Sequence, residues 1–187
     1  MKPTLRIAVL ALPLLLAACE STSPSTRLQR MYTELHSAVG ERKLGQDEGD
    51  AWWRAQVDRL EATRKLVAEK QVTTANDHLY AAVILVETDA EEDLATAHEL
   101  ALRAAELGEP KGFRVAAEAL DKLCIKRGLA QKYGTQFVYE PVIKAWRLYP
   151  VDPNTTDVER KAMGVETLAE LKVRETKLNE ATGGKPN

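Results

Sequence analysis

Apolar residues recur every three or four positions through most of this chain, which is the spacing of one face of an α-helix. A first stripe predicts an amphipathic helix over residues 26–39, which ends at Gly40. Its apolar positions are Leu28, Met31, Tyr32, Leu35 and Val39. After a loop at 41–49, a second helix is expected from Asp50, as its N-cap, to about Lys70. The face expected to be buried carries Trp53, Val57, Leu60, Arg64 and Val67.

Three more helices are predicted in the middle of the chain. Residues 79–86 are an unbroken apolar run, and a buried helix is favoured because no second strand-like run exists to pair with it. Residues 91–107 and 112–127 form Ala-rich stripes that end at Gly108 and Gly128 and are joined by a short turn. We expect them to form an antiparallel helical hairpin with packing like that of tetratricopeptide or Sel1 proteins. No period recurs three times, so a full repeat array is not predicted.

The last third of the chain changes character. Residues 129–153 mix aromatic residues with Gly and Pro and predict an irregular segment that covers one end of the helices. Thr156 and Glu159 have the spacing of a capping box, which predicts the start of a short helix. A final helix is implied by Leu168, Leu171 and Leu178. The predicted fold class is therefore all-α, with a single domain over residues 27–182 and a disordered tail at 183–187.

The amino terminus has the pattern of an export signal. Lys2 and Arg6 precede an apolar run at 7–18, which is shorter than the roughly 20 residues that span a bilayer. Leu16-Ala17-Ala18-Cys19 resembles the lipobox of bacterial lipoproteins. This resemblance implies that residues 1–18 are a signal peptide and that Cys19 carries a diacylglyceryl group, with palmitate-like acyl chains. The alternative is ordinary cleavage at the same bond, which leaves Cys19 unmodified in a secreted protein.

Residues 19–26 are small and polar, which is typical of an unfolded tether between the lipidated cysteine and the domain. Glu20 stands where enterobacterial lipoproteins of the inner membrane carry Asp, and this favours the outer membrane. We therefore expect an exported protein that is anchored by its lipid to the bacterial membrane and faces the periplasm.

Composition and charge exclude several classes of protein. The chain has 187 residues, of which 44% are hydrophobic and 29% charged, so it is neither disordered nor collagen-like. Without residues 1–18 it has 24 basic and 28 acidic side chains, and this balance predicts no nucleic-acid partner. Once Cys19 is lipidated, Cys124 is the one remaining thiol, so no intramolecular disulfide is expected.

Residues 77–137 and, more loosely, 149–171 resemble the bacterial family known as domain of unknown function 6624. The residues that carry the resemblance are Tyr80-Ala81-Ala82, Glu92-Asp93, Ala97 to Ala101, Ala116 to Lys122, Gln131 to Phe137, Thr156 to Lys161, Gly164-Val165 and Leu168. The resemblance implies a common fold and no established activity. Many relatives have Gln-His-Gly where this chain has Val86-Glu87-Thr88, and Asp-Arg where it has Asp121-Lys122. If that histidine is catalytic in relatives, this chain is inactive or acts through Glu87.

Several kinds of catalytic site are excluded by the sequence. Every serine after Cys19 precedes residue 40, and no nucleophile-elbow motif is present, which argues against a serine hydrolase. His98-Glu99 begins like a zinc motif, but Leu102 stands where the second histidine ligand belongs. Neither a metal nor a cofactor is expected. Cys124 lies in an apolar helical stripe and is interpreted as a packing residue.

A loose set of polar residues remains, and two interpretations of it are open. Its members are Asp77, His78, His98, Asp121, Gln131, Tyr133, Thr135 and Gln136. In the first, His98 or His78 carries a proton, Asp121 orients it, and Tyr133 with the Gln131, Thr135 and Gln136 side chains forms a binding pocket. In the second, Asp121 accepts hydrogen bonds from the backbone amides of the 131–137 loop and the glutamine amides satisfy the rest of that backbone. We favour the second, structural interpretation.

Two hypotheses of function follow. The first is a non-enzymatic envelope lipoprotein whose helical domain binds a protein partner or supports an assembly, through an exposed apolar patch that includes Trp52, Trp146 or Tyr149. The alternative is a small hydrolase-like envelope enzyme that uses His98 and Asp121 near the loop Tyr133-Gly134-Thr135-Gln136. The first is favoured because no convincing catalytic set is present.

Overall fold

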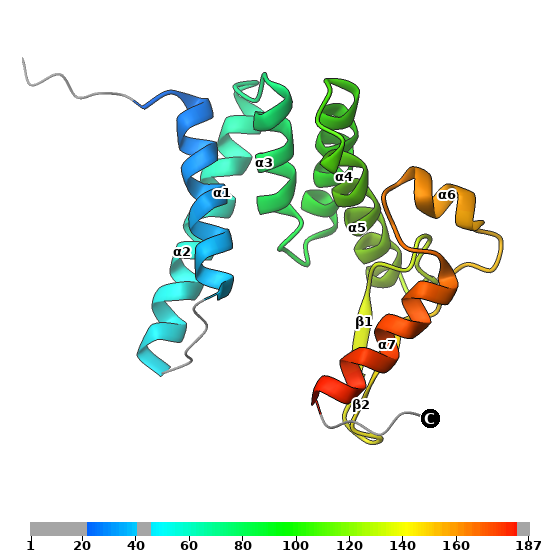
Figure 1. Ribbon diagram of the computed structural model, residues 1–187. Helices are drawn as coiled ribbons and strands as arrows, with labels where there is room; N and C mark the ends of the chain where they lie inside the picture. Colours follow the sequence, from blue (N-terminus) through cyan, green and yellow to red (C-terminus); the bar gives the residue numbers. More distant parts are fainter. Residues whose placement is uncertain (1–21, 41–45, 183–187) are drawn as a thin grey trace, which may run out of the picture.

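The computed structural model describes residues 22–40 and 46–182. The predicted signal peptide, the lipobox with Cys19 and the tail at 183–187 lie outside the described residues. Within the described part, the chain forms seven helices and one two-stranded antiparallel sheet, so the predicted all-α class is confirmed (Figure 1). The elements are α1 (Pro24–Gly40), α2 (Gln46–Ala68), α3 (Ala75–Leu85), α4 (Glu91–Glu106), α5 (Lys111–Lys126), β1 (Phe137–Glu140), β2 (Ala145–Leu148), α6 (Asp157–Ala162) and α7 (Leu168–Thr182).

The first five helices lie side by side, and α3 has neighbours on both sides. It packs against α1 and α2 on one side and against α4 on the other, while α4 and α5 form the predicted antiparallel hairpin (Figure 1). The β1–β2 hairpin follows α5 and lies at its carboxyl-terminal end, whereas α6 lies beside α5, where Arg114 of α5 donates to Gly164 and Glu166 between α6 and α7 (Figure 1). No helix of the described part is long and apolar enough to cross a bilayer.

Helix α1 starts earlier than predicted. The Ser23 hydroxyl accepts a hydrogen bond from the Thr26 amide at 3.2 Å, and Pro24 occupies the first helical position, where its missing N–H costs nothing. The Ser25 hydroxyl donates to the buried carboxylate of Asp77 on α3 at 3.0 Å. The predicted tether at 19–26 is therefore wrong for its last three residues, which belong to the folded domain.

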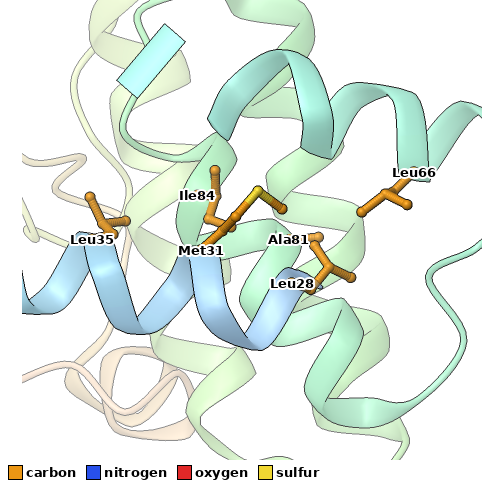
Figure 2. Close-up of a cluster of buried hydrophobic side chains, with 6 residues drawn as sticks. All are labelled: Leu28, Met31, Leu35, Leu66, Ala81 and Ile84. Carbon is orange, nitrogen blue, oxygen red and sulfur yellow. The ribbon is translucent and has the colours of Figure 1, made fainter. Parts of the chain in front are cut away.

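The stripe predicted for α1 is confirmed as a buried face at Leu28, Met31 and Leu35, and Tyr32 is half-buried. Figure 2 shows Leu28, Met31 and Leu35 pointing toward α2 and α3. There they meet Leu66, Ala81 and Ile84, and all six side chains are buried. The prediction of a buried helix for the apolar run at 79–86 is also confirmed. Helix α3 includes residues 79–85, and most side chains of the run are buried.

The prediction for α2 is wrong in its start and in part of its buried face, although Leu60 and Val67 pack against the core as predicted. The helix begins at Gln46, so Asp50 lies inside it and is not its N-cap. Trp53 and Val57 are exposed, by 63% and 49%. The buried positions are Gln56, Arg59, Thr63 and Leu66. These polar side chains tolerate burial because the Arg59 guanidinium donates to the Gln56 amide oxygen, at 2.6 Å for its shorter bond, and the Thr63 hydroxyl donates to a backbone carbonyl.

Helices α4 and α5 approach each other closely. Ala97, Ala101 and Ala104 of α4 are fully buried, as predicted for this stripe. Gly112 of α5 is buried against Ala101, Ala104 and Ala105. A Cβ atom at Gly112 would overlap the carbonyl oxygen of Ala101, so the short distance between the two helices requires glycine here.

The segment predicted as irregular contains the β-hairpin. Phe137 of β1 pairs with Leu148 of β2, and Glu140 pairs with Ala145. The exposed loop between the strands carries Val142, which is 94% exposed. The predicted capping box at Thr156 and the final helix with a buried Leu171 are both confirmed.

Candidate functional site

The loop at residues 131–136, which we call the Asp121 loop, is folded around one carboxylate. Asp121 points out of α5 and is completely buried. Its Oδ1 accepts from the amides of Lys132 and Tyr133 at 2.7 and 2.8 Å. Its Oδ2 accepts from the amides of Gly134 and Thr135, both at 2.9 Å, and from the Thr135 hydroxyl at 2.8 Å. The hydrogen-bond pattern predicted by the structural interpretation of Asp121 is thereby confirmed.

Gln131 closes the other side of the loop. Its side chain is fully buried and takes the place of a strand partner. Its amide nitrogen donates to the carbonyls of Gln136 and Tyr149, at 3.0 and 2.8 Å, and its amide oxygen accepts from the Gln136 amide at 2.9 Å. The predicted role of a glutamine amide in satisfying irregular backbone is confirmed for Gln131. Its side-chain donors and acceptor therefore serve the fold.

Arg160 is a third buried group of this region, and sequence reasoning gave it no role. It lies on α6, is 2% exposed, and donates from Nε to the Tyr133 carbonyl at 3.1 Å. Its Nη1 lies 3.0 Å from an Asp157 carboxylate oxygen. The sequence offered one indication of this role: Arg160 lies one turn after Thr156, the predicted cap of this helix, and that turn packs against the Asp121 loop. Arg160 therefore fixes the Asp121 loop to α6.

Gly134 adopts a backbone conformation with φ of +98°, and a Cβ atom there would lie 2.6 Å from Leu171 Cδ1. We expect Gly134→Ala to lower the free energy of unfolding by about 2 kcal/mol, because backbone strain adds to the overlap. Gly128→Ala is the matched control, since Gly128 has φ of +73° but nothing within 4 Å of its Cβ position. Denaturant unfolding of both variants measures the difference. Equal losses in the two would show that the Leu171 contact carries no cost.

The two candidate histidines are not assembled with Asp121. His98 on α4 has Nδ1 2.9 Å from the Ala116 carbonyl of α5. His78 on α3 has Nδ1 2.8 Å from the Thr74 carbonyl. A carbonyl only accepts, so Nδ1 carries the hydrogen in both rings. No hydrogen bond joins either ring to Asp121 in the described part of the chain, so the proton relay of the catalytic interpretation does not form.

A pocket of about 290 Å³ lies beside the loop, between the carboxyl-terminal end of α5 and the hairpin. Gln136 is the one member of the predicted binding set that lines it; Gln131, Tyr133 and Thr135 are buried in the loop. Lys122, Lys126 and Asp89 provide its charged groups. At its edge, the Lys122 ammonium donates to the Val86 carbonyl at 2.7 Å.

Neither a reactive thiol nor a metal centre is built here. Burial raises the pKa of the Cys124 thiol, and the nearby carboxylate of Asp121 raises it further, so the unreactive thiol form dominates at neutral pH. Among residues 22–40 and 46–182, no group of three His, Cys, Asp or Glu side chains is arranged to hold a metal ion.

Comparisons of the chain with models of known families, with curated proteins and with solved structures find no match. The resemblance to the family of unknown function and the tetratricopeptide-like packing therefore stay predictions, and the residues themselves must carry any functional conclusion.

Proposed function

We propose that this protein is a lipid-anchored protein of the bacterial cell envelope whose helical domain binds other proteins and performs no catalysis. One observation carries the second half of the proposal. The Asp121 carboxylate, which the catalytic interpretation needs as the orienting partner of a histidine, is fully buried and accepts five hydrogen bonds from the loop at 131–136. A carboxylate in that state has no free lone pair facing a substrate.

The hydrolase-like alternative has less support. It requires His98 and Asp121 to act together, and His98 is instead hydrogen-bonded to the Ala116 carbonyl. Tyr133 is 8% exposed, so its side chain is largely shielded from a ligand. The arrangement fits a structural role for these groups better than a catalytic one.

Exposed apolar side chains support the binding role, although they are not the predicted ones. Trp52, Trp146 and Tyr149 are half-buried. Trp53 on α2 is 63% exposed, and Val142 and Ile143 at the hairpin tip are 94% and 43% exposed. Adjacent exposed apolar side chains, such as those of Val142 and Ile143, are typical of sites where a protein partner docks.

The lipid anchor rests on the sequence. Cys19 precedes Pro24, the first residue of α1, by five positions, and five residues reach at most about 18 Å. Since Ser25 is hydrogen-bonded to Asp77, the start of α1 is fixed to the domain. A lipid on Cys19 would therefore hold the domain next to the bilayer.

Replacing Cys19 by alanine is expected to move nearly all of the exported protein from the membrane fraction to the soluble fraction. Each buried methylene group of an acyl chain contributes about 0.8 kcal/mol to membrane binding, so two chains anchor the protein firmly and their loss leaves no comparable attachment. Fractionation and mass spectrometry of residue 19 measure this. Cys124→Ala, which removes the other cysteine, should stay in the membrane fraction. Membrane retention of the Cys19→Ala protein would refute the anchor.

The binding role is tested separately, by photo-crosslinking in cells. A photoreactive amino acid at Trp53 or Val142 should yield a discrete adduct with another protein, whereas one at Lys161, an exposed charged position on α6, should not. His98→Gln should leave the adduct unchanged. The same weak background at all three positions would contradict the binding role. Loss of cellular function in His98→Gln with unchanged melting would favour the enzyme.

A further inference from the structure

The two edges of the β1–β2 hairpin are not equivalent. The outer edge of β2 is covered by side chains of α7. The Asn179 side chain accepts from the Trp146 amide at 2.7 Å and donates to the Trp146 carbonyl at 3.0 Å, as a neighbouring strand would. Glu175 accepts from the Leu148 amide. The outward amides of Trp146 and Leu148 and the outward carbonyl of Trp146 therefore have partners on α7.

The same hydrogen bonds show which way β1 faces. In an antiparallel pair, residues alternate between those that bond to the partner strand and those that face outward. The backbone amides of Trp146 and Leu148 point away from β1, toward α7. The backbone groups of their partners Tyr139 and Phe137 therefore point away from β2. The next pair agrees, because the Tyr149 amide donates to the Gln136 carbonyl. The N–H and C=O groups of Phe137 and Tyr139 thus point out of the sheet, and within the described ranges they have no partner.

We propose that two copies of this chain associate through the outer edges of β1, antiparallel about a two-fold axis at Val138. Phe137 of each copy then exchanges backbone hydrogen bonds with Tyr139 of the second copy, which satisfies all the open groups. The result is a continuous four-stranded sheet in the order β2, β1, β1, β2. A two-fold axis makes one surface complementary to itself.

The register follows from the neighbouring residues. Pairing centred on Tyr139 would place Phe137 opposite Pro141, which has no N–H to donate. Pairing centred on Phe137 would place Tyr139 opposite Thr135, whose amide already donates to Asp121. Of these three registers, only the one centred on Val138 pairs the free backbone groups of Phe137 with the free backbone groups of Tyr139.

Charge supports a second copy as the occupant of this edge. Side chains alternate between the faces of a strand, so Gln136, Val138 and Glu140 share one face. In the proposed register, Glu140 lies opposite Gln136 of the second copy. Gln136 lines the pocket together with Lys122 and Lys126. The exposed Glu140 carboxylate of one copy would therefore approach the ammonium groups of Lys122 and Lys126 of the second copy. The two-fold axis produces the same contact a second time, with the copies exchanged.

Disulfide crosslinking of the full-length protein tests the pairing. In a Cys124→Ala parent, Val138→Cys should form a covalent dimer with a mild oxidant, since directly opposed residues at such a position lie about 4.5 Å apart between Cα atoms, within disulfide range. Val158→Cys, an exposed position on α6, is the matched control, and the parent reports any contribution of Cys19. We expect about tenfold more dimer from Val138→Cys than from Val158→Cys. Equal yields would overturn the proposal.

A pair of substitutions at Tyr139 tests the backbone hydrogen bonds. Both Tyr139→Ala and Tyr139→Pro remove the ring, which lies 5.5 Å from that of Trp146, but only proline removes the outward N–H. By sedimentation in detergent, the proline variant should dimerise at least about tenfold more weakly than the alanine variant, with similar melting temperatures. Equal dimerisation of the two variants would overturn the pairing.

These results separate the inference from the proposed function. If Val138→Cys forms a disulfide with a different protein and none with itself, self-association through β1 is wrong while the binding role stands. If it forms only the dimer and photo-crosslinking captures no other protein, self-association stands and the proposed envelope partner does not.

Discussion

Replacing Asp121 by alanine is expected to lower the free energy of unfolding by about 3–5 kcal/mol. The change leaves four backbone amides and the Thr135 hydroxyl without their acceptor, in a region where Asp121 and Thr135 are buried. A buried donor without a partner loses its hydration and gains nothing in return. Equilibrium unfolding in urea measures the loss.

Asp58→Ala is the control for this experiment. Asp58 is also a helical aspartate, but it is exposed on α2, so its removal should change stability by less than about 0.5 kcal/mol. If Asp121→Ala melts like the parent and only a cellular phenotype appears, the structural role of Asp121 is wrong and the catalytic alternative returns.

Gly112→Ala should destabilise the protein by about 3 kcal/mol or more, although alanine is normally the better helix former by about 1 kcal/mol. The new Cβ would overlap the Ala101 carbonyl oxygen and lie 2.8 Å from the Ala105 nitrogen. Both are backbone atoms of α4, so relief requires the whole helix to move away from α5. The alanine contacts that fill the interface would then be lost along with it.

A rescue experiment distinguishes backbone overlap from side-chain crowding at Gly112. The Ala104 Cβ lies 3.2 Å from the position that the new atom would occupy, so Ala104→Gly would relieve crowding by a side chain but not the backbone overlap. We expect the Gly112→Ala, Ala104→Gly double variant to be no more stable than Gly112→Ala. Lys111→Ala, a change at the exposed neighbouring position, should be close to neutral. Recovery in the double variant would contradict the backbone explanation.

Local signals predicted much of this fold. Gly108 and Gly128 marked the ends of α4 and α5, because helix ends are decided by nearby residues. The role of Asp121 as a hydrogen-bond acceptor for the following loop could also be predicted from the sequence. A carboxylate inside an apolar stripe needs donors, and a following loop without a strand partner needs acceptors.

Other features depend on residues far apart in the sequence. The buried face of α2 was partly misplaced because Arg59 donates to the Gln56 amide oxygen and both side chains can be buried, which the hydropathy of single residues does not reveal. The hairpin was missed because its strands have four residues each and one edge is completed by Asn179, which lies 33 residues after Trp146. No residue close to the strands in the sequence indicates that Asn179 would be their partner.

The Asp121 loop has one more consequence for recognition. Four successive amides that converge on one point form a nest, the same arrangement with which many proteins bind phosphate or sulfate. Here the nest is filled by an anion of the chain itself, held on α5. Because the Asp121 carboxylate already accepts from these four amides, we expect the loop not to bind phosphate or another external anion.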